Sequence, residues 1–495
     1  MSLDETGQLP TQLENKAMII DKELNRHGMG RYQWLIWAIC GTGYLLDVMW
    51  AQAFGLAIPN LQRELGFSDK QYGNLGSSFS AGITAGAFVW GILVDVIGRR
   101  SAFLGTTLIA GIFGICIGAP STYDSILVLV AFTGFGVGGN IPIDTTITVE
   151  YLPEDRFYLL AALSLFQPLG VSLCTIIGFG FIPNYSCATN LEACHLVPAG
   201  MPCCTKESNM GWRYLFFTLG AITLAIFILR FFIFPFHESP KFLLSKGNDQ
   251  AAVDVVRKIA EFNRQPCHLT LESLYSLANE SPMGDMPEKP WRQRLFGELN
   301  RLKLLFASWR MARITILVWV TWMFDYWGFG IAGTYLPTIL QRKNGAIHVT
   351  LKQTYIDYLI VVLPAILAIA LAIVMIRLPV IGRKWTLVFS SMFMGISLFL
   401  YSIVNTQASR VGFNLMEYFF QSLFNAVLFG WTPEAFPAAV RGTASGLASF
   451  WGNILGITGP LIAAQLFARS NGSNAVLYLA GSGLFICTIC LICLP

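Results

Sequence analysis

Twelve apolar segments, each about long enough to cross a membrane, run through the 495 residues of this sequence. A bilayer core about 30 Å thick needs roughly 20 apolar residues per helix. Hydrophobic residues make up 54% of the chain and charged residues only 13%, which excludes an ordinary soluble domain. We therefore expect an all-α membrane protein with helices at 34–57, 73–94, 101–119, 124–149, 157–182, 213–236, 313–339, 355–376, 385–404, 411–435, 442–467 and 475–494.

A repeated spacing relates the two halves of the chain. Gly98 and Glu150 lie 52 residues apart, and so do Gly382 and Glu434. Two similar halves among long apolar segments are the layout expected of a secondary transporter. We expect two pseudo-symmetric six-helix bundles. The expected parts are a cytoplasmic N-terminal segment at 1–32, a first bundle at 33–236 with an extracellular loop at 183–212, a cytoplasmic linker at 237–312 and a second bundle at 313–495.

Lysines and arginines gather on the N-terminal side of the predicted helices. This side holds 23 of them, and the opposite side holds 9. Because positive charge marks the cytoplasmic face, both termini are expected in the cytoplasm, and the plasma membrane is the expected location. The first 32 residues show neither a signal-peptide nor a transit-peptide pattern. The net charge of +4 implies no nucleic-acid partner, and we expect a monomer in the lipid bilayer.

The linker contains one amphipathic stretch, NDQAAVDVVRKIAEF. Val253, Val256, Ile259 and Ala260 fall on one face of a helix in this stretch. We therefore expect cytoplasmic helices that lie against the bundles.

The loop at 183–212 carries four cysteines. If it faces an oxidising compartment, one or two disulfides are expected, with three possible pairings. A zinc site that includes His195 is the alternative. Sequons at Asn184 and Asn471 face the same side and are expected to be glycosylated, whereas the sequon at Asn279 is cytoplasmic. The four cysteines are Cys187, Cys194, Cys203 and Cys204.

The segment GILVDVIGRR ends the second predicted helix and opens a cytoplasmic turn. A carboxylate and two arginines at this place can pair with neighbouring helix termini, and such pairs break when the bundles move apart. The alternative is that the arginines only anchor the helix at the membrane interface.

Several motifs resemble the major facilitator superfamily. Gly91, Asp95, Gly98, Arg99 and Arg100 match its signature G-x-x-x-D-x-x-G-R-R, and GMGRYQW, GFGVGGNIPID, EYLP, WRYLF and HESPKFLL are similar to the sugar porter and synaptic-vesicle-protein-related branch. The resemblance covers nearly the whole chain and implies the major facilitator fold. It also implies latches between cytoplasmic acids and arginines that stabilise the outward-facing state. The matching residues are Asp95, Arg99, Arg100, Glu150, Arg156, Glu238, Arg383, Glu434 and Arg441.

The segment GFGVGG at 134–139 matches the dinucleotide fingerprint G-x-G-x-x-G by letter only. The fingerprint needs a strand before it and a helix after it, whereas these glycines lie inside an apolar run long enough to span a membrane. We expect them to let the fourth helix approach another helix closely.

Three acids lie far from the ends of predicted helices. Asp47 and Asp325 fall near the middle of the bilayer, and Asp144 lies nearer the cytoplasm. An acid at the bilayer centre costs about 2.5 to 3.5 kcal/mol, so it should face a wet cavity or a partner. We expect Asp47, Asp144 or both to carry a proton during transport. The alternative is a permanent hydrogen bond between helices.

The seventh helix reads WMFDYWGFGIAGTYLP. Gly328, Gly330 and Gly333 predict a break beyond its midpoint, and broken helices expose backbone groups to a substrate. Aromatic and polar side chains could surround an organic solute there, although aromatic residues in lipid are commonly packing or anchors. The predicted substrate-binding residues are Asp47, Trp50, Asn140, Asp144, Gln167, Trp322, Asp325, Tyr326, Trp327, Gln421 and Asn425.

These observations predict a transporter that works by alternating access. The expected activity is proton-coupled uptake of a small sugar-like, polyol or organic-acid solute. The alternatives are a proton-driven exporter of an organic metabolite or drug, and a sensor or scaffold without turnover. The sequence shows no enzyme motif that fits this topology, and we expect no cofactor or metal.

Overall fold

The computed structural model describes residues 12–153, 156, 158–188, 191–198, 200–233, 236–277, 305–345, 350–378, 380–404, 406–436, 441–468 and 472–494. Every one of the twelve apolar segments contains helix. Nine spans within these residues are long and apolar enough to cross a membrane. The predicted all-α membrane fold is therefore confirmed.

Within the described residues of the first half, eight α-helices occupy the six predicted segments. Its first three segments are single helices, whereas the fourth and fifth are each divided in two, and the sixth ends in a π-helical turn at Leu229–Ile233. The helices are α2 (Arg31–Leu65), α3 (Gly73–Ile97), α4 (Arg99–Cys116), α5 (Tyr123–Val137), α6 (Asn140–Tyr151), α7 (Tyr158–Ala162), α8 (Phe166–Phe181) and α9 (Gly211–Ile228).

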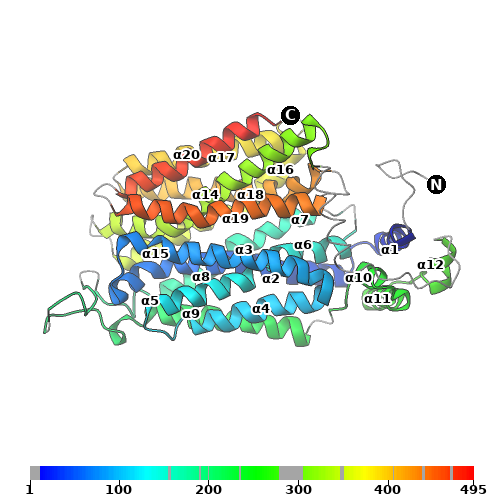
Figure 1. Cartoon of the computed structure of the whole chain (residues 1–495), viewed down its shortest axis with the longest axis horizontal. Coiled ribbons are helices and arrows are strands. Elements are labelled where there is room, and N and C mark those ends of the chain that lie inside the picture. The colour runs from blue at the N-terminus through cyan, green and yellow to red at the C-terminus, as the bar shows by residue number, and fades with distance from the viewer. Residues whose placement is uncertain are drawn as a thin grey trace.

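In the part of the second half that the structure describes, seven α-helices occupy the six predicted segments, because the eighth predicted helix is divided before Ala365. The bounds are α14 (Trp309–Gly345), α15 (Leu351–Val362), α16 (Ala365–Arg377), α17 (Gly382–Ile403), α18 (Gln407–Glu434), α19 (Arg441–Phe467) and α20 (Gly472–Ile492). Figure 1 shows the long helices of both halves side by side along the long axis of the molecule.

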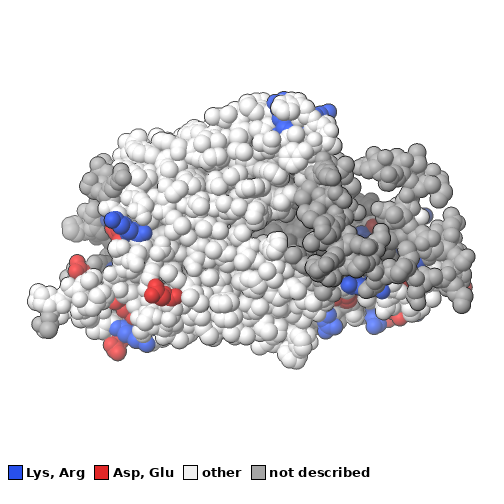
Figure 2. All heavy atoms as spheres, viewed as in Figure 1, with Lys and Arg blue, Asp and Glu red and all other residues white. Residues whose placement is uncertain are grey.

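The two ends of this axis differ. Helices α1 (Gln12–His27), α10 (Pro240–Ser245), α11 (Asp249–Asn263) and α12 (Leu271–Leu277) lie at one end, and the loop with the disulfides lies at the other (Figure 1). We call these the linker end and the loop end. In Figure 2 the charged residues gather at the two ends, and the band between them is mostly uncharged. This band carries exposed apolar side chains such as Phe88, Ile176 and Leu367, as a lipid-facing surface requires.

The predicted amphipathic helix of the linker is confirmed as α11. Its apolar face, which includes Val253, Val256, Ile259 and Ala260, is fully buried. The side chain of Asn248 caps the helix by accepting a hydrogen bond from the N–H of Ala251 at 3.2 Å.

Helix α1 was not predicted. It packs Ile20 and Leu24 into the same core as the linker helices. Ion pairs from Lys16 to Asp249 at 2.9 Å and from Lys241 to Asp21 at 2.7 Å hold it in place. The N-terminal segment therefore joins the linker in one helical layer.

The glycines of the GFGVGG segment permit close helix packing, as predicted. A Cβ at Gly134 would collide with the carbonyl oxygen of Phe79, and one at Gly138 with that of Ile83. Helix α5 therefore packs against the backbone of α3 with no strand nearby. The chain divides into α5 and α6 directly after these glycines.

The predicted break in the seventh helix is wrong. Helix α14 is continuous over 37 residues. Its glycines allow close approach of other helices instead, because a Cβ at Gly328 would lie 2.9 Å from Leu484 and one at Gly330 would lie 3.2 Å from the carbonyl oxygen of Gly456. Packing on three sides keeps the helix intact despite the low helix propensity of glycine.

Candidate functional site

The acids of the first half lie together at the buried junction of α2 and α6. Asn140 donates a hydrogen bond from Nδ2 to Oδ1 of Asp47 at 2.9 Å. Asp144 follows one turn later on α6, is fully buried, and has no hydrogen-bond partner on either oxygen among the described residues. No described group therefore hydrogen-bonds this buried carboxyl group.

Arg230 is the cation nearest these acids. A Cβ at Gly43 would collide with Oδ2 of Asp144 and would lie 3.3 Å from Nη2 of Arg230. The absence of a side chain at Gly43 thus lets the carboxylate and the guanidinium approach the same point. Asp144 interacts electrostatically with Arg230, although no direct ion pair between them is formed.

The guanidinium of Arg230 is held by groups from two other helices. Nη1 donates to Oγ1 of Thr107 at 2.6 Å, Nη2 donates to Oγ1 of Thr42 at 2.9 Å, and the guanidinium lies 3.8 Å from the centre of the Phe103 ring. Arg230 is 1% exposed. Sequence reasoning missed it, although the signal was present: an arginine inside the predicted helix 213–236 should be paired and functional.

Two of the predicted aromatic residues lie side by side on α14 in the second half. Trp322 and Tyr326 stack with ring centres 5.6 Å apart on α14. The indole N–H of Trp322 donates to Oγ1 of Thr432 on α18 at 3.0 Å, which fixes the ring. Tyr326 interacts electrostatically with Asp47 and Tyr44 across the boundary between the halves. The structure therefore brings the predicted Trp322 and Tyr326 together on α14.

Other predicted substrate-binding residues have different surroundings. Trp50 stacks on Phe216 within the first half, and its N–H donates to Thr223 at 3.2 Å. Trp327 packs against α19 and α20, and its N–H donates to the carbonyl of Leu479 at 3.4 Å. Both rings serve packing within one half.

The remaining predicted residues divide between three helices. Asp325 is 2% exposed on α14, and its Oδ1 has no partner in the described part of the chain. Gln167 is partly buried on α8. Gln421 and Asn425 lie on α18, and Nε2 of the former and Oδ1 of the latter are buried without a described partner.

The signature motifs of the first half form a compact cluster with the start of the linker. Nη2 of Arg99 lies 3.2 Å from Oε1 of Glu150. Glu238, at the start of the linker, accepts hydrogen bonds from the backbone N–H groups of Arg99 at 2.8 Å and Arg100 at 3.2 Å. Gly98 has a φ of 95°, and a Cβ there would collide with Glu238. The glycine of the signature is thus needed both for its backbone conformation and for space.

This cluster joins the first half to the linker, and it does not by itself connect the two bundles. Arg156 and Arg383 are both exposed, and each has a partner. The side chains of Asp95, Glu434 and Arg441 lie outside the described residues. The predicted latch between the halves stays a prediction.

The halves meet directly toward the loop end. Asp69 and Arg342 form an ion pair at 2.9 Å, Tyr72 hydrogen-bonds Thr338, and Ser77 donates to the carbonyl of Ile457 at 2.7 Å. These bonds join η1 (Asp69–Gln71), the residue after it and α3 to α14 and α19. The halves are therefore closed against one another on this side.

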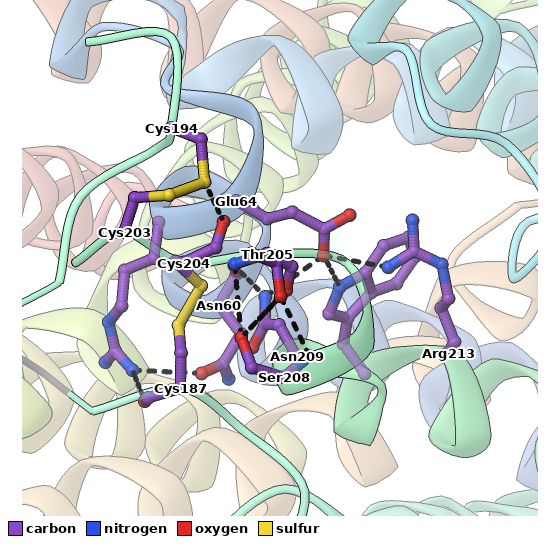
Figure 3. The surroundings of a disulfide bond; sticks show 12 residues. Asn60, Glu64, Cys187, Cys194, Cys203, Cys204, Thr205, Ser208, Asn209 and Arg213 are labelled. Atoms are coloured by element: carbon purple, nitrogen blue, oxygen red, sulfur yellow. Dashed lines mark hydrogen bonds and ion pairs between the residues drawn. A yellow bond between two sulfur atoms is a disulfide. The ribbon is translucent and has the colours of Figure 1, made fainter. Parts of the chain in front are cut away.

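The loop at 183–212 holds two disulfides, where the sequence predicted one or two, and the structure decides their pairing. Cys187 bonds Cys204, and Cys194 bonds Cys203 (Figure 3). All four cysteines of this loop are in disulfides, so none is left to bind zinc with His195. Among the described residues, no group of three or more His, Cys, Asp or Glu side chains could hold a metal ion.

A polar cluster anchors this loop to the bundle (Figure 3). Oε2 of Glu64 accepts hydrogen bonds from Arg213 at 2.8 Å, from Trp212 at 3.0 Å and from Asn209 at 3.2 Å. Asn184 is exposed near the loop's start, whereas Asn471 lies outside the described residues.

Comparisons with known proteins agree with this architecture. The sequence profile described as "Major Facilitator Superfamily" matches residues 40–381. The MFS siderochrome iron transporter 1 of Ceriporiopsis subvermispora is 33% identical over 97% of this chain and 90% of its own length. The synaptic vesicle 2-related protein of Bos taurus is 23% identical over 95% of this chain and 80% of its own.

Solved structures show the same fold. The xylose transporter XylE from E. coli, in a partially occluded inward-open conformation, matches with a TM-score of 0.67 and 16% identity over 92% of this chain and 96% of that one. The resemblance read from the sequence motifs is thereby confirmed. The chain is a multi-pass membrane protein and belongs to the Major Facilitator Superfamily.

Proposed function

We propose that this protein is a proton-coupled secondary transporter that takes up a small organic solute by alternating access. The observation that carries the proposal is the group formed by Asp47, Asp144 and Arg230, which is buried among the helices of the first half. A buried carboxylate without a hydrogen bond is costly unless a proton or a cation neutralises it. This arrangement suits a site that binds and releases protons.

The coupling follows from charge compensation. When the site is closed to water, Asp144 is neutralised either by a proton or by the approach of Arg230, whose guanidinium already contacts Thr42 and Thr107. Rotation of one half against the other changes the access of water to the site. Because a protonated and an ionised carboxyl favour different arrangements of the helices, proton binding can bias the exchange between states.

Solute recognition is assigned to the region between the acid group of the first half and the aromatic pair Trp322 and Tyr326 of the second half. Trp322 and Tyr326 stack on α14, and Asn140 donates a hydrogen bond to Asp47 in the first half. A mixture of aromatic and polar groups is typical of small-molecule sites. The named solutes of the related proteins include a siderochrome and xylose, which are chemically unlike. Sugar-like, polyol and organic-acid solutes therefore form the first screening set.

The proposed orientation places the loop end outside the cell. The two disulfides favour an oxidising compartment for that end. The linker helices and α1 then lie in the cytoplasm with both termini (Figure 1), and the plasma membrane is the proposed location.

Transport by Asp47→Asn and Asp144→Asn in proteoliposomes tests the proposal. We expect wild-type protein to accumulate a solute, identified by thermal stabilisation, when a pH gradient is imposed. The variants should keep solute exchange at zero gradient and lose most proton-driven accumulation. Asp357→Asn is the matched control, because the carboxylate of Asp357 is buried but accepts hydrogen bonds from Gln353 and Gln407. Full proton-driven accumulation by both site variants would exclude the proposed coupling.

A further inference from the structure

Helices α2 and α14 each carry a glycine four residues before an internal proline. The pairs are Gly55 with Pro59 and Gly333 with Pro337. In an α-helix the N–H of each residue donates to the carbonyl four residues earlier, and proline has no N–H. The carbonyl groups of Gly55 and Gly333 therefore both lack their usual helical donor.

The two pairs lie against each other where the halves meet. A Cβ at Gly55 would lie 2.6 Å from the carbonyl oxygen of Gly333 and 3.1 Å from Cγ of Pro337. A side chain at Gly55 would therefore push α14 away. The residue after Pro337 is Thr338, which hydrogen-bonds Tyr72 of the first half. This contact between α2 and α14 thus belongs to the closed loop end.

A cavity of about 10 Å³ lies beside the contact. Its described lining residues come from both halves, so the cavity exists only while the halves touch here. All of them are buried. The volume is about that of one water-sized probe, which is enough for a single water molecule. The lining residues are Gly55, Leu56 and Pro59 of α2, Pro337 of α14, and Thr354, Tyr355 and Tyr358 of α15.

Two polar groups at this cavity need a hydrogen bond. The hydroxyl group of Tyr358 is buried and has no partner among the described residues. The carbonyl group of Gly55 lacks the donor that Pro59 would supply if it were another residue. Buried polar groups are nearly always hydrogen-bonded, either to protein or to ordered water. A hydroxyl and a carbonyl at one small cavity are suitable partners for a bound water.

Two other contents of the cavity are less favourable. Cavities that stay empty in proteins are apolar, whereas this one is lined by the hydroxyl-bearing residues Thr354, Tyr355 and Tyr358. A metal cation prefers carboxylate ligands, and none of the described lining residues is acidic. The size and the chemistry of the lining both favour a neutral molecule of one heavy atom.

We propose that this cavity binds one water molecule, which accepts a hydrogen bond from the hydroxyl of Tyr358 and donates one to the carbonyl of Gly55. The water supplies the donor that Pro59 lacks and connects α2 to α15 across the boundary between the halves. It leaves when the loop end opens, because the cavity is then divided between the halves. The inference goes beyond the proposed function, since it involves neither the acid group nor the identity of the solute.

Radiolytic labelling of purified full-length protein tests the inference. Hydroxyl radicals formed from a bound water oxidise the buried side chains around it. Tyr355 is the reporter, because it lines the same cavity and is only 4% exposed. The variant Tyr358→Phe removes the hydroxyl and keeps the ring. The matched control is Tyr401→Phe, because the hydroxyl of Tyr401 is also buried without a described partner, and Tyr401 is not among the residues that line the cavity.

We expect Tyr355 to be oxidised in the wild type and in Tyr401→Phe. In Tyr358→Phe the oxidation of Tyr355 should fall to less than half, because the water loses one of its two partners. Absence of oxidation at Tyr355 in the wild type would overturn the inference. Equal oxidation in the wild type and Tyr358→Phe would also overturn it.

A density map of the protein with its loop end closed gives a second test. We expect one peak at about 2.7–3.2 Å from both the hydroxyl oxygen of Tyr358 and the carbonyl oxygen of Gly55. The peak should be missing in Tyr358→Phe. An empty cavity in the wild type would overturn the inference. Contacts of about 2.4 Å would do the same, because they would identify a cation.

The bound water should also favour the closed loop end. Without it, the carbonyl of Gly55 is unsatisfied in the closed state, whereas solvent reaches it in the open state. One hydrogen bond is worth a change of about two- to tenfold in the ratio of the two states. Tyr358→Phe should shift the ratio toward the open state by this factor, and Tyr401→Phe should shift it less than about twofold. Distances between spin labels on α2 and α14 measure the ratio, and equal shifts in the two variants would contradict this role of the water.

Discussion

Asp69 and Arg342, which are 273 residues apart in the sequence, form an ion pair of 2.9 Å that joins the two halves. Gln62 of α2 donates a hydrogen bond to the same oxygen of Asp69 at 2.7 Å. The guanidinium of Arg342 also lies 4.2 Å from the centre of the Phe467 ring. The pair therefore belongs to the set of contacts that closes the loop end.

Removing this pair should favour the state open at the loop end. An ion pair with partly exposed side chains contributes about 0.2–1 kcal/mol, so Asp69→Asn should change the ratio of the two states up to about fivefold. Distances between spin labels on the loop ends of α2 and α14 measure the ratio. Arg257→Gln is the control, because Arg257 pairs with Asp254 inside the linker helix α11. Equal ratios for wild type and Asp69→Asn would contradict a gating role.

Loss of Arg230 should destabilise the protein strongly. Arg230→Gln removes hydrogen bonds to Thr42 and Thr107 and leaves Asp144 without a nearby cation. Removing one member of a buried charged group costs about 3–5 kcal/mol. The double variant Arg230→Gln, Asp144→Asn should recover part of this loss. Thermal unfolding in detergent of the wild type, Arg230→Gln, Asp144→Asn and the double variant gives the interaction energy. If the stability changes of the two single variants add up to that of the double variant, the two residues do not interact.

The two disulfides should differ in their contribution to stability. They close segments of 17 and 9 residues, and the loop-entropy relation assigns about 0.6 kcal/mol more to the longer one. Replacing Cys187 and Cys204 by serine should therefore lower the melting temperature more than replacing Cys194 and Cys203. Peptide mapping under non-reducing conditions checks the pairing independently. Crosslinks between Cys187 and Cys194 would show that the pairing is wrong.

Stability should fall below about pH 6.5 because of His237. Burial lowers the pKa of His237 from 6.5, and Lys258 and Arg100 lower this pKa further. The unfolded chain therefore binds a proton at higher pH than the folded protein does, and the difference destabilises the fold as pH falls through 6.5. Unfolding of wild type and His237→Gln at pH 5.5 and 7.5 measures the effect. If both proteins lose the same stability between pH 7.5 and pH 5.5, the pH dependence comes from groups other than His237.

The helices were predictable because their signal is local. Segments such as 73–94 and 385–404 are apolar over a membrane's thickness, and α3 and α17 occupy them. The amphipathic face of α11 was likewise visible in the spacing of Val253, Val256 and Ile259. In contrast, the glycines of α14 suggested a break, because propensity alone does not report the helices that pack against Gly328 and Gly330.

The candidate site was predictable only in part. Asp47 and Asp144 stood out in the sequence as acids within apolar segments, and both are buried in the structure. Trp50 and Trp327 carried the same composition signal as Trp322 but pack within one half. The direction in which each aromatic side chain points depends on the rotation of its helix about the helix axis. This rotation is set by the helices that pack against it, and the sequence alone does not identify them.

The sequence by itself determined the membrane-spanning fold, the order of the helices and the repeat of two halves, because transfer of apolar side chains into lipid depends on each segment alone. Only the tertiary structure decided that Arg230 approaches Asp144, that Cys187 bonds Cys204, and that Asp69 meets Arg342. These contacts join residues far apart in the chain, and their existence depends on how whole helices pack against one another.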